Sequence, residues 1–165
     1  MIPEGPPIAL IGGFLIDGTG SEPEPDAVVL IEGCRIIAVG AENEIEIPED
    51  AEDIPLQGAA ILPGFIDTHV HNTANPLYLD RWAQAGVTTV RDLGAPLGLP
   101  YFRWRDRQAD DPDTARYLSA GPLVTVPEGY PIVPNGFTSL AVTSVEDARQ
   151  QITLLIEDGA EVIKI

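Results

Sequence analysis

The chain has 165 residues, and its 26 acidic and 9 basic side chains give a formal net charge of −17 at pH 7. An apolar content of 44% excludes wholesale disorder, and the length suits one domain, or one domain and part of a second. Because a chain this acidic would repel a phosphate backbone, the composition also excludes a nucleic-acid partner.

The N-terminal region lacks the signals of an exported or membrane-bound protein. Its first residues, Met-Ile-Pro-Glu-Gly-Pro-Pro, contain neither a basic start nor an apolar stretch. No apolar run in the sequence approaches the roughly 18 residues that span a bilayer. We therefore expect a soluble, cytoplasmic protein with no membrane partner.

Short strands bounded by glycine and proline are predicted for the first third of the chain. They are expected at 7–16, 27–31, 35–39 and 53–62. The turn sequence Glu32-Gly33 joins the second and third strands as a hairpin. Because Cys34 lies in the alternating run of this hairpin, we expect a small buried thiol, and a single cysteine excludes an internal disulfide. The pattern suits a small sandwich or an open sheet, and we assign residues 1–61 to a small β-sandwich-like domain.

Strand and helix patterns alternate from residue 62 onward. Strands are expected at 62–69, 87–92, 116–126 and 161–165, and helices at 75–85, 99–108 and from Ser144 to a stop at Gly159. Ser144 and Asp147 form a capping-box pattern, and the Pro/Gly-rich stretch 127–141 is expected to be a loop. This alternation calls for a parallel sheet with helical crossovers, so we assign residues 62–165 to an α/β domain.

The only two histidines, His69 and His71, stand at the end of the first strand of this α/β series. Side chains alternate along a strand, so both imidazoles point the same way, with their Cα atoms about 7 Å apart. Two such imidazoles can share a divalent cation, and zinc suits these ligands. The alternative is a pair of loop histidines that make ordinary hydrogen bonds. The C-terminal edge of a parallel sheet, where the pair falls, is the edge that carries the chemistry in α/β folds.

The only lysine, Lys164, lies near the end of the last expected strand. Its neighbours Val162, Ile163 and Ile165 are apolar, and an ammonium group buried among them is costly unless it has a role or a partner. Reaction with CO₂ would convert the amine into a carbamate, an anionic oxygen ligand able to bridge two cations. The alternative is a surface lysine whose amine extends to solvent.

Three segments resemble strand signatures of the amidohydrolase superfamily. The first-strand signature is similar to Ile61-Leu-Pro-Gly-Phe-Ile-Asp-Thr-His-Val-His71, and the second-strand region to Gly86-Val-Thr-Thr-Val-Arg-Asp-Leu-Gly94. The fourth strand of the branch that includes imidazolonepropionase-like enzymes and metal-dependent Xaa-Pro dipeptidases resembles Asp158-Gly-Ala-Glu-Val-Ile-Lys-Ile165. Upstream, 15–20 and 29–40 look like the small β domain that precedes the barrel. The resemblance spans nearly the whole chain.

The resemblance implies the N-terminal part of a (β/α)8 TIM barrel, with one or two metal ions at its open end. His69 and His71 would bind the more buried ion, zinc or another divalent cation, and Lys164, as its carbamate, would bridge to a second. A metal-bound hydroxide would attack an amide, peptide or cyclic-amide carbonyl. A small amide or peptide is the implied substrate, and we expect the complete enzyme to be a homo-oligomer.

Three further polar residues are weaker candidates. Asp67 shares the face of the histidines and could orient an imidazole. Asp92 ends the second strand of the series and could support the site or cap the next turn. Tyr130, in the Pro/Gly-rich loop, could line a substrate pocket. Three arginines alternate along the helix at 99–108, and because a spacing of two gives no common helical face, we expect a solvated surface there: Arg103, Arg105 and Arg107.

The resemblance also implies residues that are not in this sequence. It requires two more histidines, from the fifth and sixth strands, and a general-base aspartate from the eighth. A barrel takes about 250 residues, whereas 103 follow position 62. We therefore expect activity only with the C-terminal half of the barrel, supplied by a second polypeptide or by the remainder of the same enzyme. The alternative is a non-catalytic remnant or interaction module. Deaminase or phosphotriester chemistry on the same metal scaffold is a third possibility.

Overall fold

The computed structural model describes residues 5–71, 74–95, 101–109, 111–130 and 139–165. The chain divides into two compact units, Met1–Pro63 and Gly64–Ile165. The sequence pattern placed the corresponding change of structure between residues 61 and 62. None of the helices in the described ranges is both long and apolar enough to cross a membrane.

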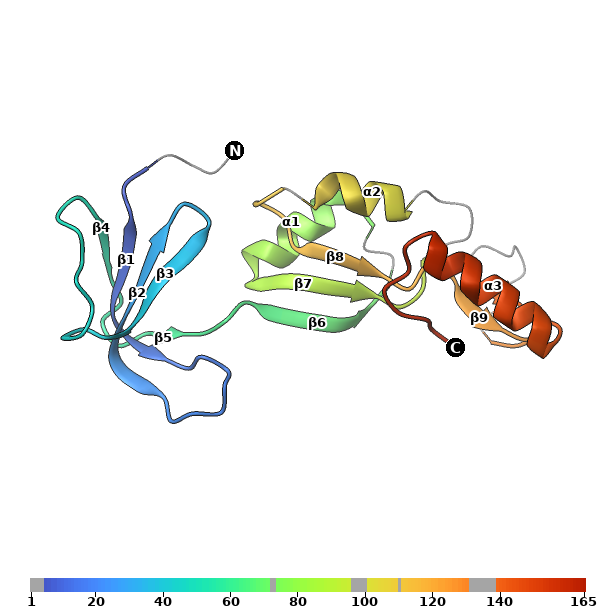
Figure 1. Ribbon diagram of the computed structural model, residues 1–165, viewed down its shortest axis with the longest axis horizontal. Helices are drawn as coiled ribbons and strands as arrows, with labels where there is room; N and C mark the ends of the chain where they lie inside the picture. The colour runs from blue at the N-terminus through green and yellow to red at the C-terminus, as the bar shows by residue number, and fades with distance from the viewer. Residues whose placement is uncertain (1–4, 72–73, 96–100, 110, 131–138) are drawn as a thin grey trace. The chain divides into compact units, whose positions relative to one another are not determined.

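The first unit is built on one mixed sheet (Figure 1). Its strands are β1 (Ile8–Leu15), β2 (Glu24–Glu32), β3 (Arg35–Ala41), β4 (Glu52–Pro55) and β5 (Ala60–Ile61). β2 lies between β1 and β3 and pairs antiparallel with both, whereas β4 and β5 pair parallel with β1. Val28, Val29 and Leu30 are consecutive and almost fully buried. Because neighbouring side chains point to opposite faces, β2 is covered on both of its faces.

Cys34 is exposed, contrary to the expectation of a buried thiol. β2 ends at Glu32 and β3 begins at Arg35, so Gly33 and Cys34 form the hairpin turn. Gly33 has a φ of 58°, the positive value that such two-residue turns favour. The expectation was wrong because alternation was extended across the turn, where side chains belong to neither face of the sheet.

The second unit contains a three-stranded parallel sheet in the order β6-β7-β8, and its arrows end at the same edge (Figure 1). The strands and the two helices between them are β6 (Phe65–Val70), α1 (Pro76–Gln84), β7 (Val87–Asp92), α2 (Tyr101–Gln108) and β8 (Arg116–Ser119). Asn75 caps α1 by accepting the N–H of Leu77, and Pro76 occupies the first turn, where its missing N–H is harmless. The expected alternation of strand and helix is confirmed over this part of the chain.

The core of the second unit lies between this sheet and its helices. It is formed by Val70, Leu79, Val90, Ala115 and Tyr117, with Trp82 and Trp104 packed against it. The rings of Trp104 and Tyr117 meet edge to face, with centroids 5.3 Å apart. These contacts hold β6, β7 and β8 in place up to the edge at which all three strands end.

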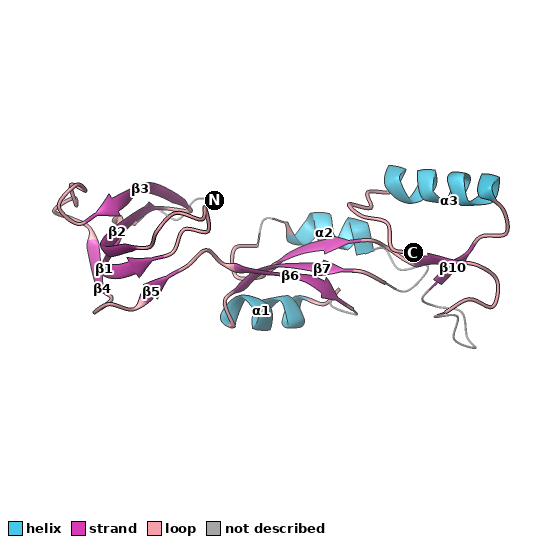
Figure 2. Cartoon of the chain, turned by 90° about the horizontal axis from the view of Figure 1, so that it is seen from below, coloured by secondary structure: helices cyan, strands magenta, loops and turns pink. Residues whose placement is uncertain are grey.

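The remainder of the unit comprises β9 (Leu123–Thr125), β10 (Ser139–Ala141) and α3 (Val145–Glu157). β10 pairs parallel with β9, and Figure 2 labels β10 and α3. The single strand expected at 116–126 is interrupted, because Gly121, at a φ of 68°, and Pro122 separate β8 from β9. β10 falls inside the stretch 127–141, which was expected to be a loop. Residues 131–138 of that stretch lie outside the described residues. Residues 99 and 100 of the second expected helix also lie outside them.

The strand expected at 161–165 is absent, although these residues are described. The segment approaches β8 and β9 through two backbone hydrogen bonds, from the N–H of Glu161 to the carbonyl of Ser119 (3.2 Å) and from the N–H of Val124 to the carbonyl of Lys164 (2.8 Å). The N–H of Ser119 is taken by the side chain of Glu161. A backbone ladder cannot form where a carboxylate occupies the donor that a neighbouring strand would use.

Candidate metal-binding site

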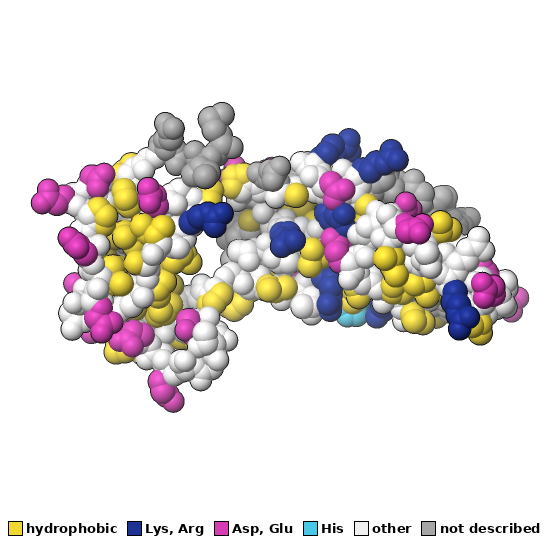
Figure 3. Space-filling view, in the orientation of Figure 1, with side chains coloured by type: hydrophobic (Ala, Val, Ile, Leu, Met, Phe, Trp, Pro, Cys, Tyr) yellow, Lys and Arg dark blue, Asp and Glu magenta, His cyan; other side chains and the backbone are white. Residues whose placement is uncertain are grey.

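The two histidines lie together at the end of β6. His69 is the penultimate residue of the strand, and His71 follows its last residue, Val70. The imidazole centroids are 5.2 Å apart with 66° between the ring planes, and both residues are exposed. Histidine is visible at the surface of the second unit in cyan (Figure 3). The end of the strand is fixed on both sides of His69, because the carbonyl of Thr68 accepts the Nε–H of Arg91 (2.9 Å) and that of Val70 accepts the N–H of Leu93 (3.0 Å).

The spacing of the rings fits two ligands of one cation. Two imidazoles that share a tetrahedral zinc ion, with Zn–N bonds of about 2.1 Å, place their centroids roughly 5 Å apart. The observed 5.2 Å therefore requires little rearrangement. An edge-to-face ring pair has a similar spacing, so the geometry is equally that of two rings in contact. The donor set supplies two imidazole nitrogens, half of what a four-coordinate ion needs.

Gly94, just beyond the end of β7, provides the surface on which the ring of His71 lies. A Cβ added at Gly94 would stand 3.0 Å from Nδ1 and 3.1 Å from Cε1 of His71, and 2.5 Å from Cδ1 of Leu123. Such distances are shorter than ordinary van der Waals contact. Only a residue without a side chain lets the imidazole and the leucine approach from two directions at this buried position.

The carboxylate of Asp92 fixes the backbone turn that follows β7 and contains Gly94. It is fully buried at the end of β7, and its Oδ1 accepts the N–H of Gly94 (3.0 Å) while its Oδ2 accepts the hydroxyl of Tyr117 (3.2 Å). The hydroxyl of Tyr117 also lies 3.4 Å from that of Ser119. Sequence reasoning named Asp92 but missed Tyr117 and Ser119. The sequence signal was the spacing of two between Tyr117 and Ser119 in the strand next to Asp92. That spacing places all three side chains on one face of the sheet.

Asp67 contacts the backbone of the histidine segment. Its Oδ1 accepts the N–H of His69 at 3.0 Å. This bond caps the end of the strand locally and is distinct from the contact with an imidazole that the spacing suggested. Tyr130 is 93% exposed in the turn region after β9, and the loop that follows from residue 131 lies outside the described residues.

Lys164 lies at the same end of the second unit as His71. Its carbonyl accepts the N–H of Val124, and the neighbouring Leu123 approaches Gly94, on which His71 also rests. The residue is half-buried. Within the described part of the chain, no three His, Cys, Asp or Glu side chains form a group that could hold a metal ion. The histidines and the lysine segment are thus brought to one end of the sheet, and further donors are needed to complete a site.

Arg105 is not the solvated residue that the spacing of the three arginines suggested. Its side chain is 17% exposed and pairs with Glu161, on the segment after α3, at 2.6 Å. Arg103 and Arg107 are exposed. The partner is 56 residues away in the sequence, so no argument about helical faces could have found it.

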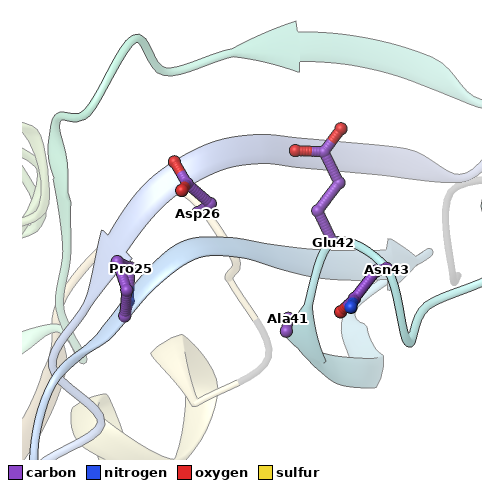
Figure 4. A pocket seen from close by; sticks show the side chains of 5 residues that line it. All are labelled: Pro25, Asp26, Ala41, Glu42 and Asn43. Atoms are coloured by element: carbon purple, nitrogen blue, oxygen red, sulfur yellow. The ribbon is translucent and has the colours of Figure 1, made fainter.

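A hollow in the first unit is separate from the candidate metal-binding residues. Figure 4 shows the side chains that line it, at the start of β2 and the end of β3. Its volume is about 550 Å³. It is lined by Pro25, Asp26, Ala41, Glu42 and Asn43. The N–H of Glu42 donates to the carbonyl of Asp26, which ties the two strand ends together at 3.0 Å. None of the candidate site residues lines the hollow.

The sequence was compared with known proteins. No protein-family model matches it. It is 29% identical over 158 residues to N-acyl-D-aspartate deacylase of Alcaligenes xylosoxydans xylosoxydans, covering 87% of this chain and 31% of that protein. It is 26% identical over an alignment of 169 positions to enamidase of Eubacterium barkeri, covering 92% of this chain and 42% of that protein.

The fold was compared with solved structures. The crystal structure of a prolidase in complex with N-methylphosphonate-L-proline superposes with a TM-score of 0.72 at 25% identity, covering 96% of this chain and 46% of that one. The similarity therefore extends over almost the whole of this mixed α/β chain. The chain spans about a third to a half of the length of these three proteins.

Proposed function

The chain belongs to the amidohydrolase superfamily, and we propose that it forms the N-terminal portion of a metal-dependent (β/α)8-barrel hydrolase that cleaves carbon–nitrogen bonds. Amide, peptide and cyclic-amide bonds are the proposed targets, and the substrate is a dipeptide or a small N-acyl amide. The deacylase and prolidase names of its relatives support this class of reaction.

One observation carries the proposal. His69 and His71 present two imidazoles 5.2 Å apart at the end of a parallel strand, and His71 rests on Gly94 where no side chain would fit. We assign both histidines to one divalent cation, zinc being the natural choice for nitrogen ligands. Lys164, as its carbamate, is assigned to the same site. A cation bound there would supply a nucleophile from water at neutral pH and polarise the scissile carbonyl.

The proposed site is completed outside the described residues. The chain covers 46% of the related prolidase structure, and two imidazoles with one carbamate leave a two-metal site without its remaining ligands and without a general base. The rest of the barrel is proposed to supply both. Within this chain, Asp92 and Gly94 position His71, and Asp67 fixes the backbone of His69. We assign these residues to the orientation of the ligands.

The proposal is tested by hydrolysis assays on the protein purified in the assembly it forms in its own cells. An N-acyl amino acid, an Xaa-Pro dipeptide and a cyclic amide are offered with zinc and bicarbonate present. We expect hydrolysis of at least one of them and a loss of about 100-fold or more in kcat/KM for His71→Asn. Thr68→Ala, on the opposite face of the same strand, is the matched control and should retain the rate.

Two results would contradict this assignment. An assembly that hydrolyses a substrate equally well with His71→Asn would exclude the histidine pair from the reaction. An assembly that hydrolyses none of the three classes would favour a non-catalytic module that keeps the fold of the superfamily.

A further inference from the structure

Among the described residues, one ion pair joins two separate segments, and it is formed by Arg105 of α2 and Glu161 of the segment after α3. Nη1 of Arg105 lies 2.6 Å from Oε1 of Glu161, and the two side chains are 17% and 34% exposed. The same Nη1 donates to the carbonyl of Gly159 at 2.6 Å, and the guanidinium stands 5.4 Å from the ring centroid of Phe102. Arg105 also pairs with the adjacent Asp106, whose Oδ1 lies 2.7 Å from Nη2. Loss of Arg105 therefore leaves the carboxylate of Glu161 without its cation, whereas loss of Glu161 leaves the guanidinium with Asp106.

Glu161 is bonded on its other side to the end of β8. Its Oε2 accepts the N–H of Ser119 at 2.9 Å, and its own N–H donates to the carbonyl of Ser119 at 3.2 Å. One residue thus joins the segment after α3 to the sheet, while Arg105 joins it to α2. We call Arg105, Ser119 and Glu161 the α2–β8 clamp.

Glu161, one member of the clamp, lies three residues before Lys164, in a stretch that forms no strand. Beyond Glu161, one further backbone hydrogen bond among the described residues joins this segment to a strand, from the N–H of Val124 in β9 to the carbonyl of Lys164. Gly159 permits the close approach of Arg105, because a Cβ there would lie 3.0 Å from Nη2. Without a ladder of backbone bonds, the register of this segment against β8 and β9 depends on the contacts of Glu161.

We propose that Arg105 and Glu161 are positioning residues that fix the register of the segment carrying Lys164, so that the lysine keeps its place beside β9. The role of Lys164 as a ligand rests on the proposed function. The proposed register of the segment does not rest on the proposed function, because it follows from hydrogen bonds among residues of this chain.

Amide hydrogen exchange tests the register directly, in the full assembly. The reporter is the N–H of Val124, which is protected by the carbonyl of Lys164, and the reference is the core N–H of Ala115, which donates to the carbonyl of Leu79. Arg105→Ala and the milder Glu161→Gln should each speed exchange at Val124 roughly tenfold or more relative to Ala115. Arg149→Ala is the matched control, because it removes an exposed ion pair with Glu146 in α3 and should leave the ratio unchanged.

The outcomes separate this inference from the proposed function. Unchanged protection of Val124 in both clamp variants would overturn the positioning role. A second readout is the ¹³C signal of a carbamate on Lys164 in protein equilibrated with ¹³C-bicarbonate. If Val124 exchanges faster in the variants and the carbamate signal falls with it, both proposals are supported. If Val124 responds but the wild-type protein carries no carbamate, the clamp stands and the ligand role of Lys164 fails.

Discussion

At the scale of single residues, the position of His71 depends on Gly94 and Asp92. The glycine leaves room for the imidazole, and the buried carboxylate of Asp92 holds the N–H of that glycine at 3.0 Å. Neither residue needs to contact a cation or a substrate to matter for the site. Their effect is to fix the place of the ring beside the end of β7.

Replacing Gly94 with alanine should displace the ring of His71. The added methyl would stand 3.0 Å from Nδ1 of His71 and 2.5 Å from Cδ1 of Leu123, so one of them must move. We expect a loss of about 1–3 kcal/mol in the free energy of unfolding from urea titration. The Hε1 chemical shift of His71 should change in the same variant. Gly5→Ala, where no atom lies within 4 Å of the new methyl, is the control. Equal stabilities and equal His71 shifts would contradict this account.

Residue-level prediction succeeded where a motif is local and failed where partners are distant. His69 and His71 could be paired because alternation along one strand is enough to place them on one face. Arg105 could not be placed, because its partners Gly159 and Glu161 lie 54 and 56 residues away. Cys34 was misplaced because alternation was carried through a turn.

At the scale of elements, α3 begins with two mutually supporting caps. Oγ of Ser144 accepts the N–H of Asp147, and the carboxylate of Asp147 accepts both the N–H and the hydroxyl of Thr143. The backbone N–H of Thr143, and then its hydroxyl, hold the pKa of Asp147 below its ordinary value of 3.8. An anion in the first turn also interacts favourably with the helix dipole.

The stability of α3 should therefore depend on pH in one direction. A depressed pKa in the folded state means that the charged form of Asp147 stabilises the helix above pH 3.8, and that this contribution is lost as the pH falls through the lowered pKa. Exchange protection of α3 amides should fall over that acid range in the wild-type protein and change less in Asp147→Asn. Glu157→Gln, at the other end of the helix, should behave as wild type. An identical pH response in all three proteins would refute the capping role.

Elements defined by local patterns were predicted well, whereas the segment whose structure depends on a distant side-chain contact was not. The capping residues of α3 and the β6–α1–β7 unit follow from signals within a few residues. The segment 161–165 has strand-like composition, yet the side chain of Glu161 takes the backbone donor of Ser119 that a strand would use. The periodicity of apolar residues in the sequence cannot predict this competition between a side chain and the backbone.

At the scale of the whole molecule, the second unit leaves apolar side chains on its surface. Phe65 and Ile66 of β6 are 59% and 62% exposed, and Val145 of α3 is 71% exposed. The chain also spans less than half of the related prolidase structure. Both observations fit the proposal that further strands complete the barrel and its site. The sequence could indicate such a need through its motifs, but the ligands that would complete the site are not among its two histidines.

The most direct test of the central claim is the metal content of the natively purified assembly, measured together with its intact mass. After removal of free metal, we expect about one to two zinc ions per copy of this chain, and a clear loss of bound zinc in His69→Asn. An assembly that stays metal-free after incubation with zinc and bicarbonate, or that binds equally well with His69→Asn, would contradict this claim.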